Sequence, residues 1–280
     1  MATVRHRRLA RELRRLREDA GLRPAAVARE LGWDRSKISR IETARTKPRE
    51  ADVEGLLTLY GCAGPHREEL LALARDARRR DWWTAFGDVF DGTFVALEDE
   101  AAEIRSWQPQ LVPGLLQTEE YARAVIGAAR GCGRAETDRR VQARMARRPL
   151  LSRPEGAPRF DAVLDEAVVR RVVGGPEVMR LQIAELWAAA QRPNVTVRIV
   201  PFGAGAHAGV DGRFVLLGFA RDDDPDVAYI ESAAGDLYPE SPEEVTRLRL
   251  AWERLRGAAL SPKDSAAFLA GLSREWAGGT

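Results

Sequence analysis

The sequence has very few cysteines, histidines and lysines. It contains two cysteines, Cys62 and Cys132, three histidines, and lysine only at Lys37, Lys47 and Lys263. Two cysteines that lie 70 positions apart, with only three histidines in the chain, are too few for a zinc finger or a disulfide framework. No apolar run reaches the roughly 18 residues that a membrane span needs. The basic N-terminus leads into an amphipathic pattern rather than the apolar core of a signal peptide. We therefore expect a cytoplasmic protein without a membrane segment.

The charge of the chain is unevenly distributed. The 280 residues carry a net charge of only +2, but residues 1–50 alone carry 15 basic against 7 acidic side chains. The first 50 residues thus have a net charge of +8 and the remainder −6. A basic segment on an acidic body suits a protein whose one end approaches phosphates. The alternative is an arginine-rich helix face that is simply solvated.

The first 80 residues predict five short helices. Gly21 and Gly32 are placed to end the first and second helices, because glycine favours the position just past a helix. Pro24 suits the first position of the second helix, and Asp34 is a suitable N-cap for the third. Apolar residues recur at helical spacing near residues 9–20, 24–31, 35–42, 50–60 and 65–79.

The third of these helices, Arg35–Glu42, has only two apolar residues, Ile38 and Ile41, which lie three positions apart. Burial alone would stabilise so short a helix very little, so its polar and basic face is expected to have another partner. Two short helices joined by a glycine-containing turn, the second of them basic, constitute a helix-turn-helix.

The run LRRLREDAGLRPAAVARELGWDRSKISRIETARTKP, residues 13–48, resembles the XRE family of helix-turn-helix domains, which includes Cro and the phage repressors. Its most specific part is SKISRIE at residues 36–42. The resemblance implies sequence-specific binding to double-stranded DNA. It places Arg35, Ser36 and Arg40 where family members read base edges in the major groove. Arginine suits this task because its planar fork meets guanine O6 and N7 together.

The resemblance also implies the supporting contacts. Lys37, Ser39, Arg45 and Lys47 lie where phosphates are held, which sets the register of the protein on DNA without reading its sequence. Family members often have Thr-Gln at the start of the second helix, where the glutamine touches a phosphate. This chain has Arg23-Pro24 there, and Arg23 is the expected electrostatic replacement. Arg17 and Glu42 match a family pair that joins the first helix to the end of the third. The alternative for these two residues is a pair of independent surface charges.

The remainder of the chain has a different composition from residue 82 onward, and we place the domain boundary at residues 78–81. This gives a DNA-binding domain over residues 1–80 and a second domain over residues 81–280. Helical patterns lie at residues 94–105, 119–129, 136–147, 177–191, 242–257 and 262–276. Strand-like runs lie at residues 159–164, 195–200, 213–219 and 227–231, with a long glycine-rich loop at residues 201–212. The predicted fold is therefore multidomain: an all-α head followed by an α+β domain with a small, mainly antiparallel sheet and flanking helices.

Four blocks of this second domain, at residues 106–126, 164–179, 192–219 and 229–238, resemble one known domain of unknown role. It follows XRE heads in many actinobacterial regulators of the WhiJ-like, toxin–antitoxin-like group. The resemblance implies a transcriptional regulator that is often encoded beside a small acidic protein, which is a candidate partner. It implies no established ligand.

The second domain has few signs of an active site. His207, with Asp165, Glu166, Glu231 and Asp236, could supply a base and acids, but no catalytic spacing is recognisable. The glycine-rich loop lacks the Lys-Ser/Thr of a phosphate-binding loop. We expect His207 to be a loop histidine bonded to backbone. We expect four aromatic residues to belong to the core rather than to a ligand cage: Trp107, Tyr121, Trp187 and Tyr229.

Three functions remain for comparison. The first is a homodimeric DNA-binding regulator, a repressor or antitoxin-like protein, which a small protein partner modulates. The second is the same regulator with a small-molecule effector in its second domain, which a preformed apolar pocket would indicate. The third is an enzyme with a DNA-binding head, which a cluster of ionisable groups with strongly shifted pKa values would indicate. The sequence favours the first, with no enzymatic activity and no cofactor.

Overall fold

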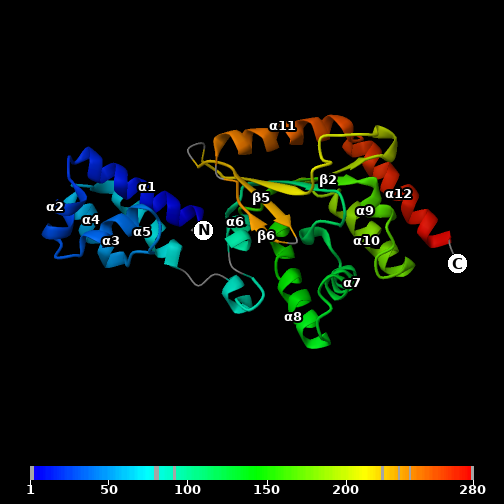
Figure 1. Cartoon of the computed structure of the whole chain (residues 1–280), viewed down its shortest axis with the longest axis horizontal. Helices are drawn as coiled ribbons and strands as arrows, with labels where there is room; N and C mark the ends of the chain where they lie inside the picture. The colour runs from blue at the N-terminus through cyan, green and yellow to red at the C-terminus, as the bar shows by residue number, and fades with distance from the viewer. Residues whose placement is uncertain are drawn as a thin grey trace. The chain divides into compact units, whose positions relative to one another are not determined.

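The computed structural model describes residues 3–78, 82–90, 93–221, 224–232, 234–239 and 241–278. The chain forms two compact units, residues 1–100 and residues 101–280 (Figure 1). The boundary predicted between residues 80 and 81 lies outside the described residues. Among the described residues, no helix combines the length and the apolar character needed to cross a membrane.

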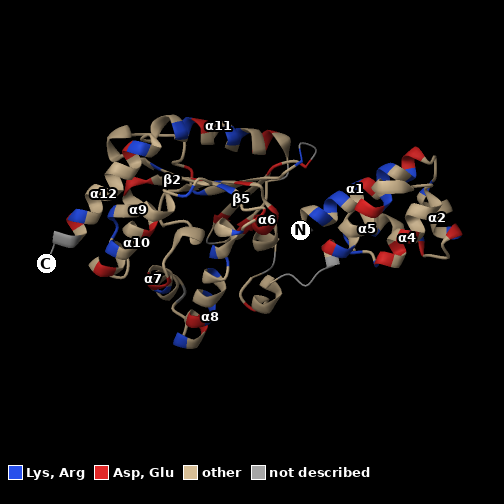
Figure 2. Ribbon diagram, turned by 180° about the vertical axis from the view of Figure 1, so that it is seen from behind, with Lys and Arg blue, Asp and Glu red and all other residues tan. Residues whose placement is uncertain are grey.

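The first unit begins with the five predicted helices. They are α1 (Val4–Asp19), α2 (Pro24–Glu30), α3 (Arg35–Glu42), α4 (Glu50–Leu59) and α5 (Gly64–Arg78). Each contributes apolar side chains to one buried cluster, in which Leu13 of α1, Val27 of α2 and Leu57 of α4 are fully buried. Basic and acidic side chains are interspersed along α1 (Figure 2). The five helices α1 to α5, which we call the head, therefore share one core, and none of them could bury its apolar face alone.

Backbone geometry sets the ends of these helices. Gly21 and Gly32 have φ of 67° and 65°, a left-handed conformation that glycine adopts without a steric cost. Beyond Gly32, the Trp33 N–H donates to the carbonyl of Ala28 (2.7 Å). The Asp34 carboxylate then accepts the Ser36 N–H at 2.7 Å and so caps α3. The Ser36 side chain and its N–H both bond to the carboxylate and lower the pKa of Asp34, because they stabilise the ionised form.

One predicted helix is too long at its C-terminal end. The pattern at residues 94–105 predicts a continuous helix, but α6 (Thr93–Glu100) ends at Glu100, and Glu103–Gln108 forms the strand β1. β1 pairs with two other strands, one on each side, and these pairings outweigh its local helical preference. The rest of the first unit is the 3₁₀ helix η1 (Trp82–Phe86), whose Trp83 packs with α6.

The second unit is built on a six-stranded mixed sheet with the order β3-β2-β1-β4-β5-β6. Its other strands are β2 (Arg159–Asp165), β3 (Val195–Val200), β4 (Phe214–Gly218), β5 (Val227–Ser232) and β6 (Gly235–Leu237). β1, β2 and β3 are parallel, whereas the pairings β1–β4, β4–β5 and β5–β6 are antiparallel. The predicted α+β class is confirmed, and the four strand-like runs all form strands. The sequence analysis did not find β1 and β6.

Helices flank this sheet. They are α7 (Glu119–Arg130), α8 (Arg134–Met145), α9 (Glu166–Arg170), α10 (Pro176–Ala189), α11 (Pro242–Ala258) and α12 (Pro262–Gly278). α11 covers one face, with Trp252 and Leu255 in one buried cluster with Trp107, Val163 and Leu216 of the strands (Figure 1). Charges of both signs lie along α11 (Figure 2).

The edge strand β3 is closed by the segment around the start of α12. The Ile199 N–H donates to Ser265 Oγ (3.0 Å), and the Ile199 carbonyl accepts the Leu260 N–H (2.8 Å). Ser265 is fully buried. These contacts occupy polar groups of an edge that could otherwise pair with another chain.

The loop between β3 and β4 is packed against the sheet by a tryptophan. Trp107 Nε1 donates to the carbonyl of Gly209 (3.0 Å), and Trp107 has no exposed surface. A Cβ atom on residue 209 would lie 2.4 Å from the Trp107 ring. Position 209 therefore accepts only glycine unless the indole or the loop moves.

This close approach predicts a position-specific effect of alanine in the loop. Gly209→Ala should destabilise the second unit by about 1–3 kcal/mol, because the added methyl overpacks the buried indole. Gly203→Ala is the matched control, since a Cβ there meets nothing within 4 Å. It should stay within about 1 kcal/mol of the parent protein. Denaturant unfolding of the full chain measures both, and equal effects would contradict the packing described.

Candidate nucleic-acid interface

The polar residues of α3 share one exposed face. Successive residues of an α-helix rotate by about 100°. Arg35, Ser36, Ser39 and Arg40 therefore fall within one arc of about 140°, and all four are exposed. The opposite side carries Ile38 and Ile41, each 1% exposed. The structure thus brings together the three predicted base-reading residues, Arg35, Ser36 and Arg40, on a surface open to solvent.

Most of the predicted phosphate contacts lie around this face. Ser39 belongs to the arc itself, and Arg45 and Lys47 are exposed in the segment that follows α3. Arg23 is exposed at the N-cap of α2. The Arg45 N–H donates to the Arg40 carbonyl (2.8 Å), so the chain turns back directly after the helix.

That turn needs an unusual backbone conformation. Ala44 has φ of 52°, the left-handed region in which glycine is the usual residue after a helix. His6 of α1 steadies the segment, because its Nε2 lies 3.0 Å from the Thr46 carbonyl. Burial lowers the pKa of His6 and outweighs the hydrogen bond to Thr46, which raises it; the nearby Lys47 also lowers it. The neutral imidazole is therefore the form that the fold favours.

Lys37 differs from the other predicted phosphate contacts, because its ammonium is already engaged within the head. Lys37 Nζ lies 2.7 Å from Asp52 Oδ1 on α4 and 3.6 Å from the centroid of the Trp33 ring. This cluster was not predicted from the sequence. No local signal pointed to it, because Trp33 lies in the turn before α3 and Asp52 lies on α4.

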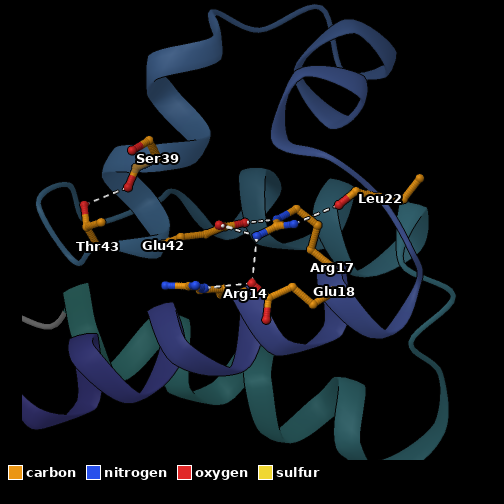
Figure 3. A network of polar contacts seen from close by, with 7 residues as sticks. All are labelled: Arg14, Arg17, Glu18, Leu22, Ser39, Glu42 and Thr43. Atoms are coloured by element: carbon orange, nitrogen blue, oxygen red, sulfur yellow. Dashed lines mark hydrogen bonds and ion pairs between the residues drawn. The ribbon is translucent and has the colours of Figure 1, made fainter.

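Arg17 and Glu42 meet between α1 and the end of α3 (Figure 3). Arg17 Nε donates to Glu42 Oε1 (2.6 Å) and Nη2 donates to Oε2 (3.0 Å), which is a bidentate pair. Each side chain is only 8% exposed. Arg17 Nη1 also donates to the Leu22 carbonyl (2.7 Å), and Nη2 lies 3.3 Å from Glu18 Oε1. One guanidinium therefore joins α1, the turn that follows it and the end of α3.

The acid–base residues considered in the second unit are largely occupied by structural contacts. His207 Nδ1 accepts the Gly209 N–H (3.2 Å), and its Nε2 lies 3.4 Å from Asp165 Oδ2. Glu166 accepts the Phe202 N–H (2.8 Å), and Glu231 pairs with an arginine of the same sheet region. Asp236 lies apart from His207, on β6. In the described parts of the chain, no group of three His, Cys, Asp or Glu side chains is arranged to hold a metal ion.

Three of the four aromatic residues expected in the core are buried: Trp107, Tyr121 and Tyr229. The prediction is wrong for Trp187, which is 45% exposed on α10. The helical spacing gave Trp187 an apolar setting, but at about 100° per residue Trp187 lies just beyond the edge of the buried stripe that includes Ile183 and Leu186.

The Arg17–Glu42 pair predicts strong coupling between its two residues. Removing one partner leaves a buried charge without compensation, so Arg17→Ala and Glu42→Ala should each cost about 1–3 kcal/mol. The double variant should lose less than the sum of the two. Urea unfolding of the four proteins gives the coupling free energy. The control is the pair of Arg15 and Glu12, in which Arg15 is 56% exposed. It should show coupling of at most about 0.5 kcal/mol, and additivity at Arg17–Glu42 would contradict the prediction.

Two family models match the chain. The model described as a helix-turn-helix domain matches residues 8–70, which include most of α1, all of α2 to α4 and the exposed face of α3. The model described as a domain of unknown function, DUF5753, matches residues 91–271. No curated protein and no solved structure matches the chain. Because the second model covers more than half of its length, the chain belongs to the DUF5753 family and carries an N-terminal helix-turn-helix domain.

Proposed function

We propose that this protein is a sequence-specific DNA-binding transcriptional regulator of the XRE type that acts in the cytoplasm. The observation that carries the proposal is the exposed face of α3, where Arg35, Ser36 and Arg40 point away from the apolar core. Two exposed arginines add little to the stability of so short a helix, so a binding partner outside the protein explains their place on α3. The major groove of DNA admits an α-helix and presents the acceptors that arginine recognises.

The roles of the individual residues follow from their positions. Arg35, Ser36 and Arg40 lie on the exposed arc of α3 and read base edges. Four other exposed residues hold phosphates: Ser39 on the same arc, Arg45 and Lys47 after α3, and Arg23 at the N-cap of α2. Two of these, Arg45 and Lys47, follow the strained turn at Ala44, which directs the chain back along the helix. The net charge of +8 in residues 1–50 supports attraction to the phosphate backbone.

The regulator acts as a repressor or antitoxin-like protein under the control of a small acidic protein. An acidic partner suits this regulator, because its negative charge, once it is bound to the second unit, would repel the DNA phosphates. The second unit receives the partner and has no enzymatic role. Its histidine at position 207 has both ring nitrogens close to structural partners, which supports this assignment.

Binding-site selection from a pool of random duplexes, with the full chain as bait, tests the central proposal. A sequence motif enriched over several rounds supports it, and recovery of random sequences only would reject it. The enriched duplex then serves as the specific probe in the experiments below. Co-purification with the product of the neighbouring gene tests the partner separately.

Base-reading and phosphate-binding residues should respond differently to alanine. Arg35→Ala should cost about 1–3 kcal/mol on the enriched duplex and relax the preference at one base pair. Lys47→Ala should weaken binding to all duplexes alike and reduce the slope of log K against log salt by about one. Fluorescence anisotropy titrations at several salt concentrations measure both quantities. If both variants keep the full sequence preference, the assignment of Arg35 is wrong.

The protein should bind DNA as a homodimer. One recognition helix reads only a few base pairs, so specificity requires two half-sites about one helical turn apart. The second unit should supply much of the dimer contact, because the head is small and its surface is charged. Sedimentation equilibrium at micromolar concentration checks the mass with and without the enriched duplex. A monomer under both conditions would exclude the dimer.

A further inference from the structure

We propose that Lys37 is a positioning residue, which with Trp33 and Asp52 sets the rotation of the recognition helix α3 about its own axis. The inference rests on the proposed function and deepens it, because it assigns Lys37 a role in specificity instead of contact with a phosphate. It is carried by the two contacts of Lys37 in the Trp33–Lys37–Asp52 cluster and by the place of Lys37 on the helix.

The first contact joins α3 to α4. Lys37 Nζ lies 2.7 Å from Asp52 Oδ1, and the second oxygen of that carboxylate accepts the Arg49 N–H at the start of α4 (3.1 Å). The Asp52 carboxylate is thus positioned at the start of its own helix, independently of its contact with Lys37. The side chains of Lys37 and Asp52 are 30% and 18% exposed, so water screens the pair only in part.

The second contact joins Lys37 to the turn between α2 and α3. The Trp33 side chain packs against the core of the head, and its backbone N–H donates to Ala28 (2.7 Å). The Lys37 ammonium lies 3.6 Å from the ring centroid, within the range of a cation–π interaction. The lysine therefore has an aromatic surface on one side and a carboxylate on the other.

The place of Lys37 on the helix explains what the cluster can do. At about 100° per residue, Lys37 lies about 60° beyond the arc of Arg35, Ser36, Ser39 and Arg40. It flanks the buried stripe of Ile38 and Ile41 on one side. Glu42 flanks the same stripe on the other side, where it pairs with Arg17 of α1.

Two ion pairs on opposite flanks resist rotation of α3 in both directions. The two isoleucines alone would tolerate some rotation, because apolar packing has no direction of its own. Rotation moves the side chains of the exposed arc relative to base edges, whereas the charge of the surface stays the same. Loss of the cluster should therefore reduce discrimination between sequences more than it reduces general attraction to DNA.

The experiment compares four variants of the full chain: Lys37→Met, Asp52→Asn, the double variant and Lys37→Arg. Asparagine at position 52 keeps an acceptor for the Arg49 N–H. The readouts are the ratio of affinities for the enriched and a random duplex, and the salt slope of each. Asp76→Asn, an exposed carboxylate of α5, is the control for the loss of one negative charge.

We expect Lys37→Met and Asp52→Asn to lower the affinity ratio by a similar factor, about three- to tenfold, and the double variant to lower it no further. Lys37→Arg should restore most of the ratio, because arginine can both stack and pair. The salt slope of Lys37→Met should equal that of the parent. The proposal is overturned if Lys37→Met lowers the salt slope by about one and leaves the affinity ratio unchanged. It is also overturned if Asp52→Asn, like Asp76→Asn, raises the affinity for both duplexes and leaves their ratio unchanged.

Hydrogen exchange of the full chain without DNA separates this inference from the proposed function. Each single variant should speed exchange of the α3 amides by a similar factor, with no further gain in the double variant. If the factors by which the two single variants speed exchange instead multiply in the double variant, the cluster is rejected, whatever the DNA-binding experiments give. Coupled exchange in a protein that enriches no duplex would support the cluster and reject the DNA-binding proposal.

Discussion

The bidentate pair of Arg17 and Glu42 is the interaction on which the head depends. The helix α3 has eight residues, too few to be stable alone, and only Ile38 and Ile41 of it are buried. Its direction must come from its neighbours. The Arg17 guanidinium supplies this by binding Glu42 and the Leu22 carbonyl together, at a site that is mostly closed to water. Such a pair adds little net stability, but its geometry is specific.

The exposed face of α3 is a consequence of this arrangement. Because Glu42 and Lys37 are engaged on either side of the apolar stripe, Arg35 and Arg40 remain directed to solvent. The strained conformation of Ala44 then turns the chain, and His6 holds the following segment through Thr46. The charged groups of the head thus fall into two classes, those that orient the recognition helix and those that are presented on it.

The second unit shows the same use of polar contacts at the margins of an apolar core. Ser265 and Leu260 close the edge strand at Ile199, and Trp107 fastens the long loop through Gly209. His207 bonds within that loop and lies beside Asp165 at the end of β2. These contacts close the sheet edge at Ile199 and hold the loop between β3 and β4 against the sheet.

The sequence by itself determined the helices of the head, since their signals are local: apolar spacing, Gly21 and Gly32 after the helices, and Asp34 before α3. It also determined the four longer strands outside β1, because each is rich in β-branched or aromatic residues. Only the tertiary structure decided that Glu103–Gln108 is a strand, since its polar residues become a central strand through pairing with β2 and β4. Likewise, nothing local joins Lys37 to a carboxylate fifteen positions away. Contacts between elements depend on how the helices pack, and that packing is a property of the whole core rather than of any segment.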